Sequence, residues 1–125
     1  FTSVTLQSDG KIVVSGRGGS GIAVDGTFAV ARFNSNGTID STFAGDGAFS
    51  VEIGTSFNDL AEAVEILPDG KILASGFTDS GTPAANLMLV KLNSNGTADT
   101  SFGGGDGIVA TAIPSTNGES GRDII

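Results

Sequence analysis

Two short segments of the chain carry oxygen-bearing side chains at spacings that resemble part of a calcium-binding loop. In the first segment these residues are Asn34, Asn36, Gly37 and Asp40, and calcium takes carboxylate and amide oxygens. The second segment repeats them as Asn93, Asn95, Gly96 and Asp99. However, the position at which a calcium loop has its first ligand is occupied by a cation, Arg32. The position of the acid that would complete the calcium coordination is occupied by a phenylalanine. We therefore favour a hairpin turn in which Asn and Asp bond their own backbone, and we predict no metal.

Aspartate-glycine pairs form a second candidate set, because a carboxylate at a loop tip can bind sugar hydroxyls or a cation. The chain holds five such pairs, which indicates that they are its ordinary means of making turns. We assign no ligand-binding residue on this basis. The predicted structural turn residues are Asp9, Gly10, Asn36, Gly37, Asp40, Asp46, Gly47, Asp69, Gly70, Asn95, Gly96, Asp99, Asp106 and Gly107.

The composition removes the commonest catalytic groups. With no His and no Cys, the chain has no Ser-His-Asp triad, no Cys-His dyad and no imidazole or thiolate zinc site. A pair of acids could hydrolyse glycosides, but Glu62 and Glu65 fall on opposite faces of a predicted strand, and no Trp or Tyr offers a sugar platform. We predict a protein that is not an enzyme, with no catalytic residue and no cofactor.

The charge and the hydropathy of the chain exclude several classes of binding partner. The 14 acidic and 6 basic side chains give a net charge of −8, which disfavours nucleic acid and anionic lipid because both require clustered Lys and Arg. No run of 18 apolar residues occurs, so we expect no membrane insertion. An acidic, glycine-rich chain without cysteine is typical of bacterial secreted and surface proteins, so we expect a secreted or cell-surface (extracellular) location.

The chain repeats itself at a spacing of 59 or 60 residues. Several blocks recur in the same order, which chance does not produce. Residues 6–12 recur as 66–72, residues 34–38 recur letter for letter as 93–97, Asp40-Ser-Thr-Phe43 returns as Asp99-Thr-Ser-Phe102, and Gly45-Asp-Gly47 returns as Gly105-Asp-Gly107.

Each period reads as four short strands joined by Gly-rich turns. In the second copy we predict Ala61–Leu67, Lys71–Phe77, Leu87–Leu92 and Ile108–Ile113. Apolar residues occupy both faces of the third strand, since Leu87 and Leu89 alternate with another apolar set. A sheet that is apolar on both faces must be covered on both. The pattern therefore predicts an all-β fold of β-propeller-like blades, with four antiparallel strands per repeat of about 60 residues and about two blades in the chain.

The repeat boundaries predict the domain organisation. Residues 1–60 form the first repeat, starting inside a strand, and residues 61–125 form the second repeat plus the start of the next first strand. Because such repeats generally need three or more units to bury their core, we expect adjoining blades as partners. These blades belong to the same chain, to identical chains or to a larger host protein.

Three motifs resemble the delta-60 repeat: Leu/Ile-x-x-Asp-Gly-Lys-Ile, the hairpin at residues 33–38, and Asp-x-x-Phe followed by Gly-Asp-Gly. The resemblance covers essentially the whole chain in both copies. That family is a tandem repeat of large bacterial secreted and surface proteins. The resemblance implies an array of β-propeller-like blades and no catalytic residues.

These observations support two functional hypotheses. The first is a non-enzymatic extracellular repeat scaffold with a structural, adhesion or assembly role. The alternative is a lectin-like module that binds ligands with the blade-tip loops Arg17–Thr27 and Thr78–Asn86. In either case we expect the cations Arg32 and Lys91 to pair with Asp40 and Asp99 and so to organise the hairpins.

Overall fold

The computed structural model describes residues 1–19, 26–53, 58–78 and 86–112. All regular structure within these residues is β-strand, arranged as two four-stranded antiparallel sheets. The first sheet contains β1 (Ser3–Leu6), β2 (Ile12–Gly18), β3 (Thr27–Phe33) and β4 (Ala48–Val51) in that order. The second sheet contains β5 (Leu60–Ile66), β6 (Ile72–Thr78), β7 (Asn86–Leu92) and β8 (Ile108–Ala112).

The predicted fold class is confirmed, since each repeat forms one four-stranded antiparallel sheet. The strands of the second repeat begin or end within about one residue of the predicted bounds, as is usual for strand ends. Ile113, predicted as the end of the last strand, lies outside the described residues, as does the predicted start of a further strand near residue 125.

The first strand of the second sheet departs from simple alternation. A β-bulge lies between Ala61 and Ala63, where the pairing of β5 with β6 shifts by one residue. As a result Ala61 and Val64 both lie in the core, although strict alternation would place them on opposite faces. The prediction that Glu62 and Glu65 lie on opposite faces assumed an uninterrupted strand, and the bulge contradicts that assumption.

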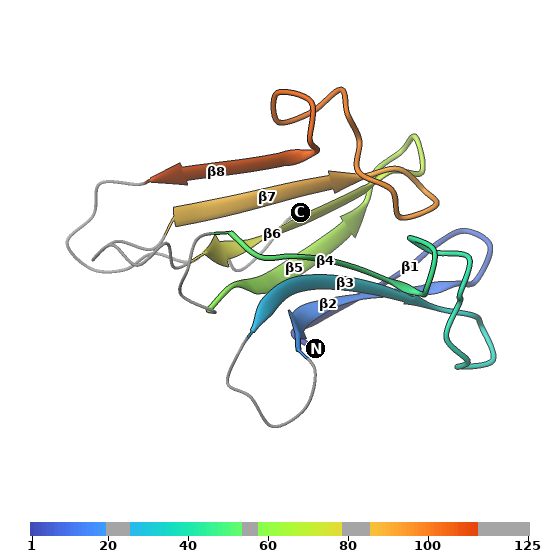
Figure 1. The fold of residues 1–125 in the computed structure, drawn as a ribbon. Helices are drawn as coiled ribbons and strands as arrows, with labels where there is room; N and C mark the ends of the chain where they lie inside the picture. Colours follow the sequence, from blue (N-terminus) through green and yellow to red (C-terminus); the bar gives the residue numbers. More distant parts are fainter. Residues whose placement is uncertain (20–25, 54–57, 79–85, 113–125) are drawn as a thin grey trace.

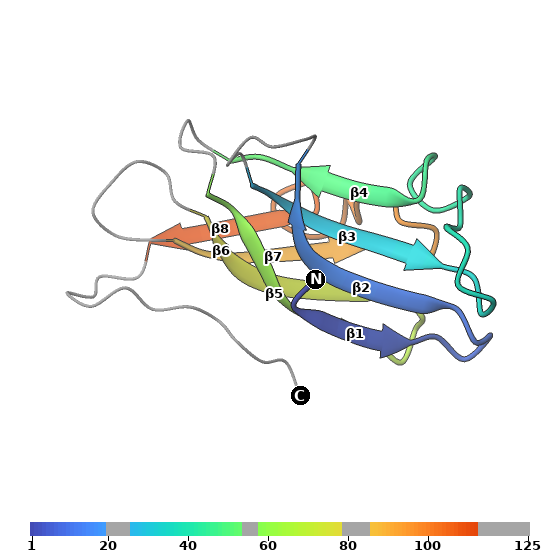
Figure 2. The same ribbon diagram turned by 90° about the horizontal axis from the view of Figure 1, so that it is seen from below.

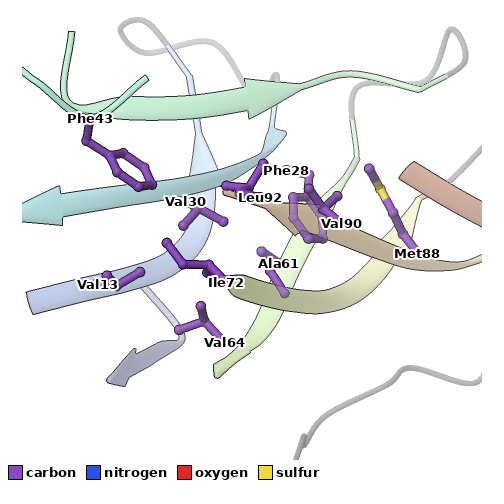
Figure 3. Close-up of a cluster of buried hydrophobic side chains, with 11 residues drawn as sticks. Val13, Phe28, Val30, Phe43, Ala61, Val64, Ile72, Met88, Val90 and Leu92 are labelled. Atoms are coloured by element: carbon purple, nitrogen blue, oxygen red, sulfur yellow. The ribbon is translucent and has the colours of Figure 1, made fainter. Parts of the chain in front are cut away.

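The two sheets stack face to face (Figures 1 and 2), and their facing side chains form a single core. Figure 3 shows these side chains pointing into the space between the sheets. Eight of the core residues are fully buried with 0% exposure and are larger than alanine: Val13, Phe28, Val30, Phe43, Ile72, Met88, Val90 and Leu92. Since burial of one large apolar side chain contributes about 1.5–3 kcal/mol, this core is the main force that holds the repeats together.

The two sheets use opposite faces for this contact. The first sheet contributes Phe28 and Val30, which correspond in the repeat to Leu87 and Leu89. The second sheet instead buries Met88 and Val90, whose neighbours Leu87 and Leu89 point the other way and stay half-buried. Successive repeats therefore stack in the same orientation, with one face of each sheet against the opposite face of the next.

No helix in the described part of the chain is long and apolar enough to cross a membrane.

Candidate functional site

A buried ionic cluster holds the end of β3 in the first repeat. Asp40 is 3% exposed, and one carboxylate oxygen accepts hydrogen bonds from Lys11 Nζ at 2.6 Å and Arg32 Nε at 2.8 Å. The other oxygen accepts from the backbone N of Thr42 at 3.1 Å and from its hydroxyl at 2.6 Å. One carboxylate thus ties together the turn before β2, the end of β3 and the loop that leads to β4.

The second repeat builds the same cluster around Asp99, with looser contacts. Lys71 Nζ donates to Asp99 at 2.8 Å, and Ser101 donates through its backbone N at 3.1 Å and its hydroxyl at 2.7 Å. Lys91, which stands where the first repeat has Arg32, lies 3.6 Å from the carboxylate. Its side chain is 25% exposed, against 8% for Arg32. The predicted pairing of the strand cation with the hairpin acid is present in both repeats.

The clusters hold both acids in their charged form. The hydrogen bond from Lys11, followed by that from the Thr42 hydroxyl, holds the pKa of Asp40 well below its usual range even though partial burial opposes this. Lys71 and then Ser101 lower the pKa of Asp99 in the same way. In return, the hydrogen bond to Asp99 raises the pKa of Lys71.

These shifts predict acid sensitivity. Because the folded pKa of each acid lies below the unfolded value of about 3.9, the unfolded chain binds protons first as the pH falls. The stability contributed by Asp40 and Asp99 is therefore fully present above about pH 5 and declines progressively as the pH falls below the unfolded pKa and on towards the lower folded pKa. Urea midpoints measured across this range should fall, and the double variant D40N/D99N should show a shallower fall. An unchanged slope in the variant would contradict this assignment.

The two hairpins are built by identical side-chain hydrogen bonds. In the hairpin of residues 34–38, Asn36 Oδ1 accepts from the Thr38 hydroxyl at 2.7 Å and from the Thr38 N at 3.1 Å, and Asn34 Nδ2 donates to the same hydroxyl at 3.1 Å. The hairpin of residues 93–97 repeats all three, at 2.7, 3.1 and 3.0 Å. These bonds form the local Asn turns that we favoured over a calcium loop.

The remaining predicted turn residues occupy the connections between strands. Each turn aspartate accepts a hydrogen bond through Oδ1 from the backbone N two residues on; these are Asp9, Asp46, Asp69 and Asp106. The predicted turn glycines all have positive φ, and they are Gly10, Gly37, Gly47, Gly70, Gly96 and Gly107. The aspartates therefore face their own loops.

The hairpin of residues 93–97 has a second role, because it docks on the first sheet. Arg32 Nη1 donates to the carbonyl of Ser94 at 2.6 Å, and Ala44 N donates to the carbonyl of Asn95 at 2.9 Å. Gly96 lies against the ring of Phe43, so closely that a Cβ there would sit 2.8 Å from that ring and 2.7 Å from Ala44 N. Phe43 is fully buried by this contact and carries the Arg32 guanidinium 4.7 Å from its ring centre.

Sequence reasoning missed two parts of this arrangement. It did not bring Lys11 and Lys71 to the hairpin acids, although the two lysines precede those acids by nearly the same number of residues, 29 and 28, and so carried a signal. It also did not find the docking of the second hairpin on the first repeat. No motif marks that contact, since both hairpins have the same sequence and only one of them is covered.

The structure does not assemble the other candidate sites considered from sequence, within the residues that it describes. Within the described ranges no group of three or more acidic side chains is placed to hold a metal ion. The same residues enclose no pocket for a small molecule. Most of the loops proposed for ligand binding, residues 20–25 and 79–85, lies outside the described residues.

Comparison with known proteins places this architecture in a family. No curated protein matches the chain. A family model described as "Domain of unknown function (DUF5122) beta-propeller" matches residues 7–43 and 67–102, one segment in each repeat and together more than half of the chain. Both segments run from the turn after the first strand to the phenylalanine of the Asp-x-x-Phe motif. The chain therefore belongs to the DUF5122 beta-propeller family.

Proposed function

We propose that the chain is a non-enzymatic repeat scaffold whose blades pack against further blades of the same kind, in the same chain or in another copy. The observation that carries this proposal is that each outer face of the pair is the repeat equivalent of a face that is buried between the two sheets. A surface that has the same side chains as one half of a packed interface can pack against a surface like the other half.

The outer face of the first sheet shows this most clearly. Val4 is 64% exposed, whereas its repeat equivalent Val64 is 5% exposed in the core. Leu6 is 67% exposed, and its equivalent Ile66 packs against the core. Large apolar side chains grouped in this way on a sheet are typical of a surface that another unit covers.

The outer face of the second sheet is the complementary half. Leu87 and Leu89 are half-buried there, whereas their equivalents Phe28 and Val30 are fully buried against the neighbouring sheet. A following blade that repeated the internal packing would place a surface like that of Val4 and Leu6 on these two leucines. Stacking in one orientation then extends the array, and each added blade covers one exposed face and offers another.

The finer parts of the proposal rest on sequence. The motifs resemble the delta-60 repeat, and with the acidic, cysteine-free composition they support a secreted or cell-surface location and a structural or adhesion role. The absence of His and Cys from the whole sequence supports a role without the commonest catalytic chemistry.

The test places charge on the exposed apolar face. The double variant V4K/L6K should keep the fold, because both side chains are more than half exposed, and should weaken self-association of the chain at least about tenfold. Sedimentation measures this at moderate salt, which screens repulsion between chains of net charge −8. The control S8K/T100K makes the same charge change at exposed turn positions. Equal weakening by both variants would count against packing through this face.

A further inference from the structure

We propose that the hairpin of residues 34–38 docks on a second copy of the chain, at a surface made by Lys91, Phe102 and Gly103, which we call the receiving surface. The contact repeats the one by which the hairpin of residues 93–97 binds Arg32, Phe43 and Ala44 within the chain. The inference rests on the proposed blade packing and names the contact that sets its direction and register.

The free hairpin is a preformed copy of the docked one. The two share the sequence Asn-Ser-Asn-Gly-Thr and the same three side-chain hydrogen bonds. They differ in their surroundings. Gly96 is buried against Phe43, whereas Gly37 is exposed, with no atom within 4 Å of the place of a Cβ. Because its shape is already held by internal bonds, the free hairpin loses little conformational entropy on docking.

The receiving surface is the uncovered counterpart of the occupied one. Phe102 is half-buried where Phe43 is fully buried. Lys91 Nζ lies 5.8 Å from the centre of the Phe102 ring, as Arg32 lies over Phe43. Within the described residues, the backbone N of Gly103 makes no backbone hydrogen bond, whereas its equivalent Ala44 N is bonded to Asn95.

Each group on the receiving surface has a matching group on the free hairpin. By equivalence with the internal contact, Gly103 N would donate to the carbonyl of Asn36, and Lys91 would donate to the carbonyl of Ser35. The flat ring of Phe102 would face Gly37, where only a glycine leaves room. The contact joins two different surfaces, so copies associate head to tail and form a ring or a filament.

Two variants separate the halves of the contact. In G37N, the new side chain has open space in the free hairpin and Asn tolerates the φ of +84°, but at the docked position its Cβ would meet the phenylalanine ring. F102A removes the ring from the receiving surface. Each variant alone should associate at least about tenfold more weakly than the unchanged chain. Mixed together, they should form a 1:1 complex and nothing larger, because one intact hairpin and one intact receiving surface remain.

Two further variants test whether the effects are specific to the docked contact. G70N adds the same side chain at another open glycine of positive φ, and it should leave association unchanged. K91R places on the receiving surface the guanidinium that the occupied surface carries, and it should tighten association by about threefold to tenfold through a charge-assisted hydrogen bond. Circular dichroism and thermal melting show that each variant is folded.

The outcomes distinguish this contact from blade packing in general. Association of G37N equal to that of the unchanged chain, with V4K/L6K still weakened, would overturn hairpin docking and leave blade packing standing. Mixtures of G37N and F102A that stay monomeric would also overturn it. An unchanged chain that is monomeric at every concentration would overturn both proposals for association between copies.

Discussion

The substitution F43A is expected to lower the free energy of unfolding by about 3–5 kcal/mol, the cost of removing a fully buried phenylalanine from a packed core. Phe43 is 0% exposed, lies beneath the second hairpin and supports the Arg32 guanidinium. Its loss would open a cavity at the junction of the two sheets.

The matched control is F102A, the same change at the equivalent position of the second repeat. Phe102 is only half-buried, so we expect a loss of about 1–2 kcal/mol. Denaturation by urea measures both variants, at a protein concentration low enough to keep the chain monomeric. Equal losses in the two variants would contradict the docking of the second hairpin on the first repeat.

The second large effect is expected at the glycine of the docked hairpin. Gly96 has a φ of +87°, and a Cβ there would meet Phe43 and Ala44 below 3.0 Å. G96A should therefore combine the cost of a left-handed alanine, about 1–2 kcal/mol, with overpacking of about 1–3 kcal/mol.

The comparison with G37A isolates the docking contribution. Gly37 has nearly the same φ, +84°, and open space at the Cβ position, so only the backbone cost of about 1–2 kcal/mol applies. The difference between the two variants, measured by urea unfolding of the monomer, reports how tightly the hairpin sits on the first repeat. A difference near zero would mean that the second hairpin is not held there.

Much of the fold could be predicted because the repeat doubles every local signal. Asp-Gly and Asn-Gly pairs mark the turns in both copies, and the side chains of β7 are apolar on both faces. Apolar residues on both faces of this strand thus predicted, from the sequence alone, that other sheets stack on both sides of it. The bulge between Ala61 and Ala63 carries no such signal, because neither a glycine nor a break in the apolar pattern marks it.

The ionic clusters and the docking contact were only partly accessible from sequence. The pairing of Arg32 with Asp40 follows from their positions on either side of one hairpin, but the bond from the Arg32 guanidinium to Ser94 depends on the second repeat, which covers this cation. Identical hairpin sequences gave no means of distinguishing the docked copy from the free one. That difference arises from which neighbour each hairpin has, which is a property of the assembled fold.

Both outer faces of the blade pair are expected to be packing surfaces, and self-association of the chain follows from this directly. The mass of the unchanged 125-residue chain in solution, measured by sedimentation equilibrium at moderate salt, tests this claim directly. We expect the average mass to rise with concentration from 12.4 kDa to multiples of that value. A folded chain that stays at 12.4 kDa up to about 1 mM, the limit of weak association, would contradict packing between copies.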